Sequence, residues 1–359
     1  MKIIEVCGKI KKRSFLKFLE TNVNMKKSIL FIAMGMLILG GIISIYFIIS
    51  TYLDGYWIWG NDSDYEITGQ FGDFFGGVVG TFFALAGTLL VVLTFKEQAK
   101  QNKRESFETK FYEMLHLHKQ NVNEIQVDKL KGRVAIEKLF YDYKAIYEIV
   151  ERAVYEIENT TPPSTDDEEV NRFDKMKGFL SNQNDKLRFI NNLSYGYFFY
   201  GFENYYVTKD DKDVQFIINV DVTCILIRDK AQKSLFIPRN SLLGHYFRHL
   251  YQTIQFIARD EDLKEDEKYN YAKMVRAQLS DFEQALLYYN SLSIMGQNWI
   301  NPLGESNVEK MCLIARFRLI KNIPYYYEYF GILPGNLFVS EKKEWEKLGK
   351  KFFEIELIK

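Results

Sequence analysis

Two long stretches without a charged side chain constrain this chain more than any other feature. Residues 29–53, ILFIAMGMLILGGIISIYFIISTYL, and residues 74–95 contain no Asp, Glu, Lys or Arg. A helix rises about 1.5 Å per residue, so each stretch can cross the roughly 30 Å hydrocarbon core of a bilayer. The first is too long for a cleavable signal peptide, and no clear small-residue cleavage site follows it. We therefore expect a transmembrane helical hairpin rather than two buried helices of a soluble protein.

Basic residues lie before and after this pair of stretches but not between them. The connection, residues 54–73, contains five acidic residues and no Lys or Arg, whereas basic residues precede the first stretch and follow the second. The positive-inside rule then puts both termini in the cytoplasm and the connection outside. We predict a basic N-terminal segment at 1–28, a hairpin at 29–95 and a cytosolic domain at 96–359.

Small residues recur at every fourth position of the second stretch. The sequence GQFGDFFGGVVGTFFALAGTLL places them on one helix face, and they are Gly72, Gly76, Gly80, Ala84 and Thr88. This spacing is typical of helices that approach closely in lipid. A phosphate-binding loop is excluded because no Gly-Lys-Ser/Thr follows. We expect this face to pack against another helix, either within the hairpin or in a homo-oligomer.

The balance of charged residues and the spacing of cysteines and histidines argue against DNA-binding and metal-binding proteins. Lys plus Arg and Asp plus Glu are equal at 47 each, so the chain has no overall charge signature of a DNA-binding protein. The three cysteines have no metal-binding spacing. His245 and His249 are four positions apart, but Tyr246 stands where the HExxH motif requires Glu. We expect no metal and no cofactor.

Apolar periodicity predicts a mainly α-helical cytosolic domain. Residues 133–158, 241–259, 268–293 and 306–324 repeat apolar side chains at spacings of three and four, and a short last helix is expected at 341–355. Residues 214–226 alternate strictly instead, which indicates a small β-hairpin near 214–237. No internal repeat and no alternation of strands with helices is present, so a doubly wound sheet is excluded.

Two polar stripes supply the candidate catalytic residues. On the helix at 241–259 the stripe is His245, Arg248, His249 and Gln252, and on the helix at 268–293 it is Arg276, Ser280, Glu283 and Asn290. The stripes could face each other across a cleft, or they could be two solvated faces of amphipathic helices. Convergence of His245, Arg248, Arg276 and Glu283 in one cavity would favour chemistry or ligand binding.

A short motif also raises the possibility of RNA cleavage. Arg239 stands six positions before His245 and is followed by a polar residue. This spacing resembles the signature of HEPN ribonucleases, in which His acts as general acid or base and Arg steadies the phosphate charge.

Several blocks in the same order resemble the AbiC-like family of phage abortive infection proteins. They are FGDFFGGVVGTFFALAGTLLVVLTFKEQ, LSYGYFFYGF, LGHYFRHLYQTIQFI, YAKMVRAQLSDFEQALLYYNSLS and LIKNIP, and they run from about residue 70 to about residue 325. Arg239 lies just outside them. The resemblance implies a bacterial protein of the inner membrane that arrests or kills the infected cell.

The resemblance brings no agreed catalytic mechanism with it, so it assigns no active-site residues to this chain. What the resemblance implies is which positions the family pattern stresses, and these include the binding candidates Tyr246, Gln278, Ser280 and Asn290. The expected partners are the bilayer, a second copy of the chain, and a phage component or RNA. A membrane sensor or pore-like oligomer without enzymatic activity is the other alternative.

Overall fold

The computed structural model describes residues 2–53, 65–159, 174, 177–178, 180–202, 234–300, 312–321 and 330–353. These residues are mainly helical, as the periodicity predicts. The chain divides into two compact units, Met1–Lys110 and Phe111–Lys359. The division falls inside one long helix, 15 residues beyond the boundary at 95/96 expected from the apolar stretches.

The first unit contains the two apolar stretches. Helix α1 spans Lys2–Leu53. Beyond the connection, α2 (Tyr65–Phe74), a π-helical turn η1 (Phe75–Val79) and α3 (Gly80–Glu124) are continuous with one another. In the part of the chain that the structure describes, two helical segments are long and apolar enough to cross a membrane. Helical structure thus begins at Tyr65, inside the connection expected at 54–73.

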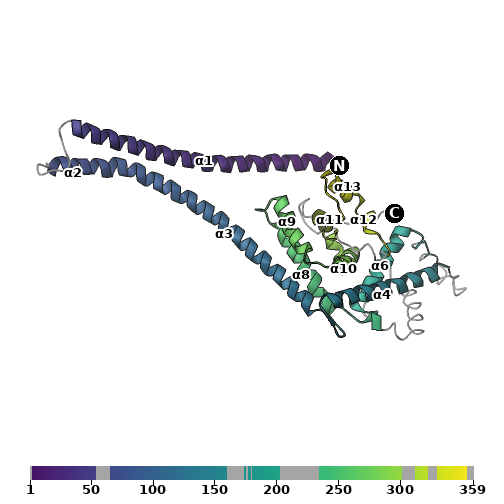
Figure 1. The fold of residues 1–359 in the computed structure, drawn as a ribbon. Coiled ribbons are helices and arrows are strands. Elements are labelled where there is room, and N and C mark those ends of the chain that lie inside the picture. Colours follow the sequence, from purple (N-terminus) through teal and green to yellow (C-terminus); the bar gives the residue numbers. More distant parts are fainter. Residues whose placement is uncertain are drawn as a thin grey trace. The chain divides into compact units, whose positions relative to one another are not determined.

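The two apolar stretches pack against each other within this unit (Figure 1). Small side chains lie in the contact, because Ala33 and Ala86 are fully buried. A side chain added at Gly40 would lie 3.4 Å from Cβ of Phe82. Phe47 stacks on Phe74 with 4.2 Å between ring centroids. Close approach of the backbones in this way is the usual basis of helix packing in lipid.

The predicted ladder of small residues does not face α1. A Cβ built at Gly72 or Gly76 meets no described atom within 4 Å, and at Gly80 it meets only the carbonyl of Phe75 in the same helix. Ala84 and Thr88 are exposed. The contact with α1 uses the neighbouring positions Val79 and Ala86 instead. The ladder therefore makes no contact with the described part of α1, and its role between copies stays a prediction.

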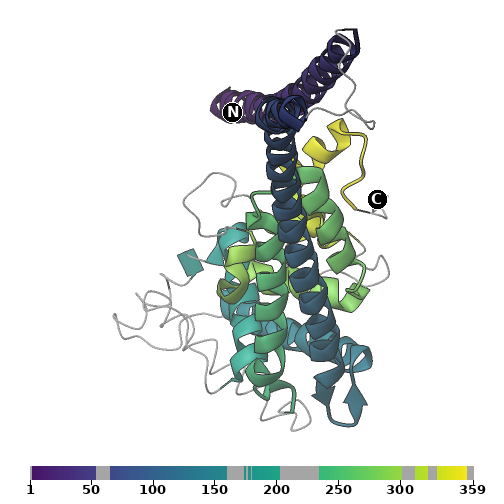
Figure 2. The same ribbon diagram turned by 90° about the vertical axis from the view of Figure 1, so that its left-hand side faces the viewer.

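The described part of the second unit is a bundle of helices with a small hairpin at its edge (Figure 2). After the end of α3 its elements are β1 (Gln126–Val127), β2 (Leu130–Lys131), α4 (Arg133–Asn159), α6 (Gln183–Tyr200), α8 (Asn240–Arg259), α9 (Glu265–Arg276), α10 (Asp281–Leu292), η4 (Ile294–Trp299), α11 (Leu313–Phe317), α12 (Pro334–Leu337) and α13 (Val339–Lys347). β1 and β2 form an antiparallel pair. Aromatic rings fill the core between α4, α6 and α10, and among the fully buried side chains are Tyr143, Tyr195, Phe198 and Tyr289.

The helix predicted at 268–293 is in fact two helices. α9 ends at Arg276 and α10 begins at Asp281. Ser280 is the N-cap of α10: its hydroxyl accepts from the Glu283 amide at 3.3 Å, while Glu283 accepts from the Ser280 amide at 2.7 Å. This reciprocal capping box satisfies backbone donors at a helix start, so the local sequence Ser-x-x-Glu ends one helix and begins the next.

Other predicted elements agree to different degrees. The helices at 133–158 and 241–259 are confirmed as α4 and α8. The helix expected at 306–324 is shorter in the described part, because α11 ends at Phe317 where Arg318 turns into the left-handed region with φ 48°. The helix expected at 341–355 is α13, which ends at Lys347.

The β-hairpin near 214–237 lies outside the described residues except for its last positions, where residues 234–236 form a 3-10 turn. The hairpin β1–β2 was not predicted.

Candidate functional site

A groove of about 620 Å³ runs along α8 beside the end of α3. The two helices lie side by side in both views (Figures 1 and 2). Three of the predicted site residues, His245, Arg248 and His249, line the groove together with Tyr246. The other lining residues are Ser241, Leu242 and Gln252 of α8, Asn121 and Glu124 of α3, and Ile125.

The amphipathic pattern of α8 explains why these residues reach the groove. The apolar side chains at Leu243, Phe247, Leu250, Ile254 and Ile257 are all buried. Because residues three and four apart share a helix face, burying this stripe turns His245 and Arg248 outward. Both are exposed, and His249 is half-buried. The first polar stripe is therefore placed as the sequence predicts.

His118, a buried histidine of α3, lies behind His249 of the groove wall. Nε2 of His249 lies 2.8 Å from the Met114 carbonyl, which orients its ring. The ring of His118 stacks on that of His249 at 6.5 Å between centroids and is only 1% exposed. Neither ring nitrogen of His118 has a hydrogen-bond partner among the described residues. Burial, followed by His249 and Arg133, lowers the pKa of His118 to about 4, so the ring is neutral at pH 7.

Glu283 lies behind the groove and not in it. Its carboxylate is fully buried and accepts a hydrogen bond from the Tyr246 hydroxyl at 3.1 Å. Burial and Glu283 raise the pKa of Tyr246, so the hydroxyl stays protonated and donates. Arg133 lies 3.7 Å from the carboxylate, and His118 Nε2 lies 3.9 Å from it. The Tyr246 hydroxyl and the Ser280 amide thus donate to this buried carboxylate, and the Arg133 guanidinium lies beside it.

Arg276 belongs to a different part of the fold. Its guanidinium donates to the carbonyls of Arg318 and Phe317 at 3.0 and 3.3 Å, where α11 ends, and is 7% exposed. A cation at a helix C-terminus satisfies carbonyls that lack partners. Of the four residues expected to converge, His245 and Arg248 share the groove, Glu283 is joined to it through Tyr246, and Arg276 is not part of it.

The weaker binding candidates also have structural contacts. Ser280 caps α10, and the Gln278 carbonyl accepts from Arg133 Nη2 at 2.8 Å. Asn290 is buried and donates to the Tyr195 hydroxyl at 3.0 Å. The second polar stripe is therefore turned into the core and is not a solvated face, because the break before Ser280 changes which side of the segment faces the bundle.

Arg239 is held inside the protein at the start of α8. Its Nη2 lies 2.8 Å from Oδ2 of Asp142, and its Nη1 donates to the carbonyls of Leu235 and Ile237. The guanidinium also lies over the ring of Phe198, 5.1 Å from the centroid. Burial lowers the pKa of Arg239, and the charge of Asp142 opposes this shift. Arg239 is 5% exposed, so in this structure His245 reaches the groove and Arg239 does not.

Three residues that contribute to this region were not singled out from the sequence. They are His118, Arg133 and Asp142. Their partners lie 165, 150 and 97 positions away, at Glu283, Glu283 and Arg239. Such distances leave no local signal, although Ser-x-x-Glu at 280–283 is a local capping signal that marks Glu283 as structural.

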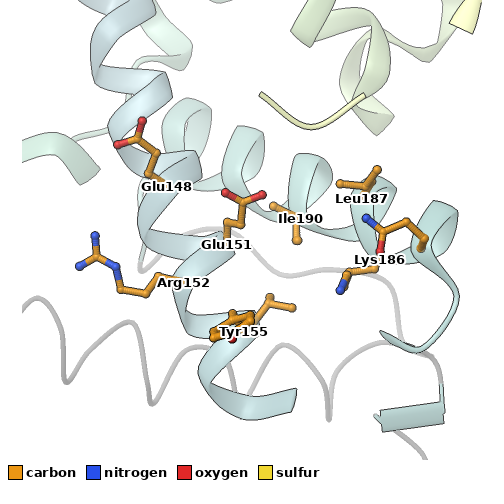
Figure 3. Close-up of a pocket in the computed structure, with 9 residues that line it drawn as sticks. Glu148, Glu151, Arg152, Tyr155, Lys186, Leu187 and Ile190 are labelled. Carbon is orange, nitrogen blue, oxygen red and sulfur yellow. The ribbon is translucent and has the colours of Figure 1, made fainter. Parts of the chain in front are cut away.

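A second cavity of about 510 Å³ lies between α4 and α6 (Figure 3). Glu148, Glu151 and Arg152 of α4 and Lys186 of α6 line it. Burial and Glu148 raise the pKa of Glu151, while Lys186 lowers it. Two acidic and two basic side chains thus line this cavity, and none of the sequence-predicted site residues is among the lining residues. Among the described residues, no group of three or more His, Cys, Asp or Glu could hold a metal ion.

Comparison with known proteins identifies the segment that carries the groove. Residues 239–326 match the model of the family described as "Putative phage abortive infection protein". The match begins at Arg239, so this residue lies within the family segment and not outside it as the sequence blocks suggested. No curated protein and no solved structure shows a significant match to the chain. This match supports the resemblance seen in the sequence over α8 to α11, and it covers about a quarter of the chain.

Proposed function

We propose that this protein is a membrane-anchored defence protein that acts by abortive infection, arresting or killing the infected bacterial cell. The observation that carries the proposal is the family match at 239–326, which covers α8 and therefore most of the groove wall. The groove brings His245, Arg248 and His249 together, so it is the best candidate for the working surface.

The two apolar helices support the anchoring part of the proposal. Their length and composition allow each to cross a bilayer. The basic flanks and acidic connection favour cytoplasmic termini, which would place the second unit at the inner face of the cytoplasmic membrane. Washing isolated membranes with alkaline carbonate tests the anchor: the full-length chain should stay in the pellet, and its release into the supernatant would contradict anchoring.

A plaque assay tests the defence function. Bacteria that express the full-length chain should give fewer plaques than cells with an empty vector across a panel of phages. The double variant His245→Ala/Arg248→Ala should lose protection at unchanged membrane abundance. Arg188→Ala removes an exposed arginine of α6 outside both cavities and is the matched control. Unchanged plaquing by wild type across the panel would contradict the function.

RNA cleavage is kept as a second candidate because Arg239 and His245 both fall within the matched segment, Arg239 as the N-cap of the helix that carries His245. His245 is exposed in the groove and could serve as general acid or base. Arg239 would contact a phosphate only if its buried pairing with Asp142 opened. RNA integrity after infection tests this candidate: full protection and unchanged RNA decay in His245→Ala would eliminate it.

We further propose that copies of the chain assemble into a homo-oligomer through the ladder of small residues in the second apolar stretch. Supporting it, Gly72, Gly76 and Ala84 lie on a face that does not pack against α1. Replacing Gly76 and Gly80 with Leu should dissociate an oligomer of the detergent-purified protein. The matched control is Gly35→Leu on α1, where a side chain also meets no described atom. An oligomer unchanged by the ladder variant would exclude this role.

A further inference from the structure

We propose that the groove along α8 binds a phosphate group, either as the free ion or as part of a nucleotide or an RNA. The inference rests on the proposed function in taking this groove as the working surface. It adds the chemical class of the ligand, and its test needs neither phage nor cells.

Arg248 is the main reason to expect an anion. Its side chain is exposed at the groove and forms no ion pair or hydrogen bond with any described residue. A Cβ built at Gly244 would lie 4.0 Å from Nη2 of Arg248, so the guanidinium lies over the backbone one turn earlier in the helix. This position is beside His245 and toward the start of α8. An arginine fork of this kind matches phosphate oxygens with two parallel hydrogen bonds.

The start of α8 adds to the attraction for an anion. Ser241 and Leu242, in the first turn of this 20-residue helix, line the same groove. The amides of Ser241 and Leu242 already donate to Oδ1 of Asn240 at 3.0 Å and to the Arg239 carbonyl at 3.1 Å, so this turn contributes the partial positive charge of the helix dipole and not free amide donors. Arg248, His245 and the Ser241 hydroxyl thus present donors along one wall.

The negative charges nearby do not cancel this arrangement. Glu283 is fully buried behind Tyr246, and its carboxylate is already bonded to Tyr246 and the Ser280 amide. The carboxylate that lines the groove is that of Glu124, on the opposite wall formed by α3. An inorganic phosphate has no need of this acceptor and would be repelled by it, whereas Arg248 would attract the ion.

The volume of the groove also suits such a ligand. Sites for small molecules and cofactors measure roughly 300–1,000 Å³, and the groove measures about 620 Å³. One wall is firmly placed, since the His249 ring is bonded to the Met114 carbonyl and stacked on buried His118. A preorganised wall reduces the ordering cost of binding.

Calorimetric titration of the detergent-solubilised full-length protein tests the inference. The probes are inorganic phosphate, AMP and an oligouridylate of eight nucleotides, each added to millimolar concentration. We expect binding of at least one probe, weakened about tenfold or more by Arg248→Ala, because the variant loses the charge-assisted hydrogen bonds of the guanidinium. Arg188→Ala should bind as wild type does. Tightest binding of phosphate, AMP or RNA would identify the free ion, a nucleotide or RNA as the source of the group.

A variant that is expected to raise the affinity for phosphate separates a local effect from loss of folding. Glu124→Gln removes the repulsion on the α3 wall and should tighten the binding of inorganic phosphate, which partial unfolding cannot do. No binding of any probe, or equal weakening by Arg248→Ala and Arg188→Ala, would overturn the inference. Protection in the plaque assay without phosphate binding would contradict the phosphate site and leave the proposed defence function intact. Phosphate binding without protection would support the site and contradict the defence function.

Discussion

The hydroxyl of Tyr246 donates a hydrogen bond of 3.1 Å to the carboxylate of Glu283, 37 positions away in the chain. This bond joins the groove wall on α8 to the start of α10. The same carboxylate caps α10 through the Ser280 amide. Two residues expected to act in a site are therefore also fixed parts of the architecture, and a variant of either will change stability as well as any activity.

The first prediction concerns Glu283 itself. Glu283→Leu leaves the Tyr246 hydroxyl and the Ser280 amide without acceptors, so we expect a loss of about 2–4 kcal/mol in the free energy of unfolding. Glu283→Gln keeps an amide oxygen that can serve in a capping box and should lose about 1 kcal/mol. Thermal unfolding of the detergent-solubilised protein measures both. Equal destabilisation by Leu and Gln would mean that the charge, not the hydrogen bonding, stabilises this position.

The buried pair of Arg239 and Asp142 gives a second prediction. Removing either partner leaves an unpaired or poorly paired buried charge, which costs about 3–5 kcal/mol. Arg239→Ala and Asp142→Ala should therefore both lower the unfolding temperature and the abundance in membranes, whereas Arg188→Ala changes stability by less than about 0.5 kcal/mol. A fully stable Arg239→Ala protein would contradict the structural role and would make this residue a cleaner test of ribonuclease activity.

His118 gives a prediction about pH. Its folded-state pKa of about 4 lies below the unfolded value of 6.5, so between these values the unfolded chain binds a proton that the folded chain does not. The stability that His118 contributes is present above pH 6.5 and is lost as the pH falls toward 4, by at most about 1.4 kcal/mol per pH unit. We expect His118→Phe to remove this part of the acid sensitivity. Unfolding of both proteins between pH 7 and pH 5 gives the difference, and a wild-type advantage that grows as the pH falls would contradict the assignment.

Gly296 gives a prediction about close packing. A Cβ at this position would lie 2.2 Å from the Asn290 carbonyl oxygen, a backbone atom that cannot move aside without shifting the end of α10. Gly296→Ala should cost roughly 1–3 kcal/mol. Gly335→Ala, in α12, meets no described atom within 4 Å and should be neutral or stabilising by up to about 1 kcal/mol. Thermal unfolding of the two variants side by side measures the contrast.

Much of the fold was predictable because helices are encoded locally. The stripe of Leu243, Phe247, Leu250, Ile254 and Ile257 predicted both α8 and the outward direction of His245 and Arg248. The same reasoning failed at 268–293, where apolar periodicity continues across the break before Ser280. The capping box that creates the break is present in the sequence, but continuous periodicity hid it.

The candidate site was predictable only in part, because burial of polar groups depends on distant partners. The sequence by itself determined the two apolar helices, the amphipathic face of α8 and hence the exposure of His245 and Arg248. Only the tertiary structure decided that Glu283, Arg276, Asn290 and Arg239 are buried, since each is matched by a group from another part of the chain. Charged and polar side chains are stable inside a protein only when such partners are in place, and this pairing has no periodicity that a single sequence reveals.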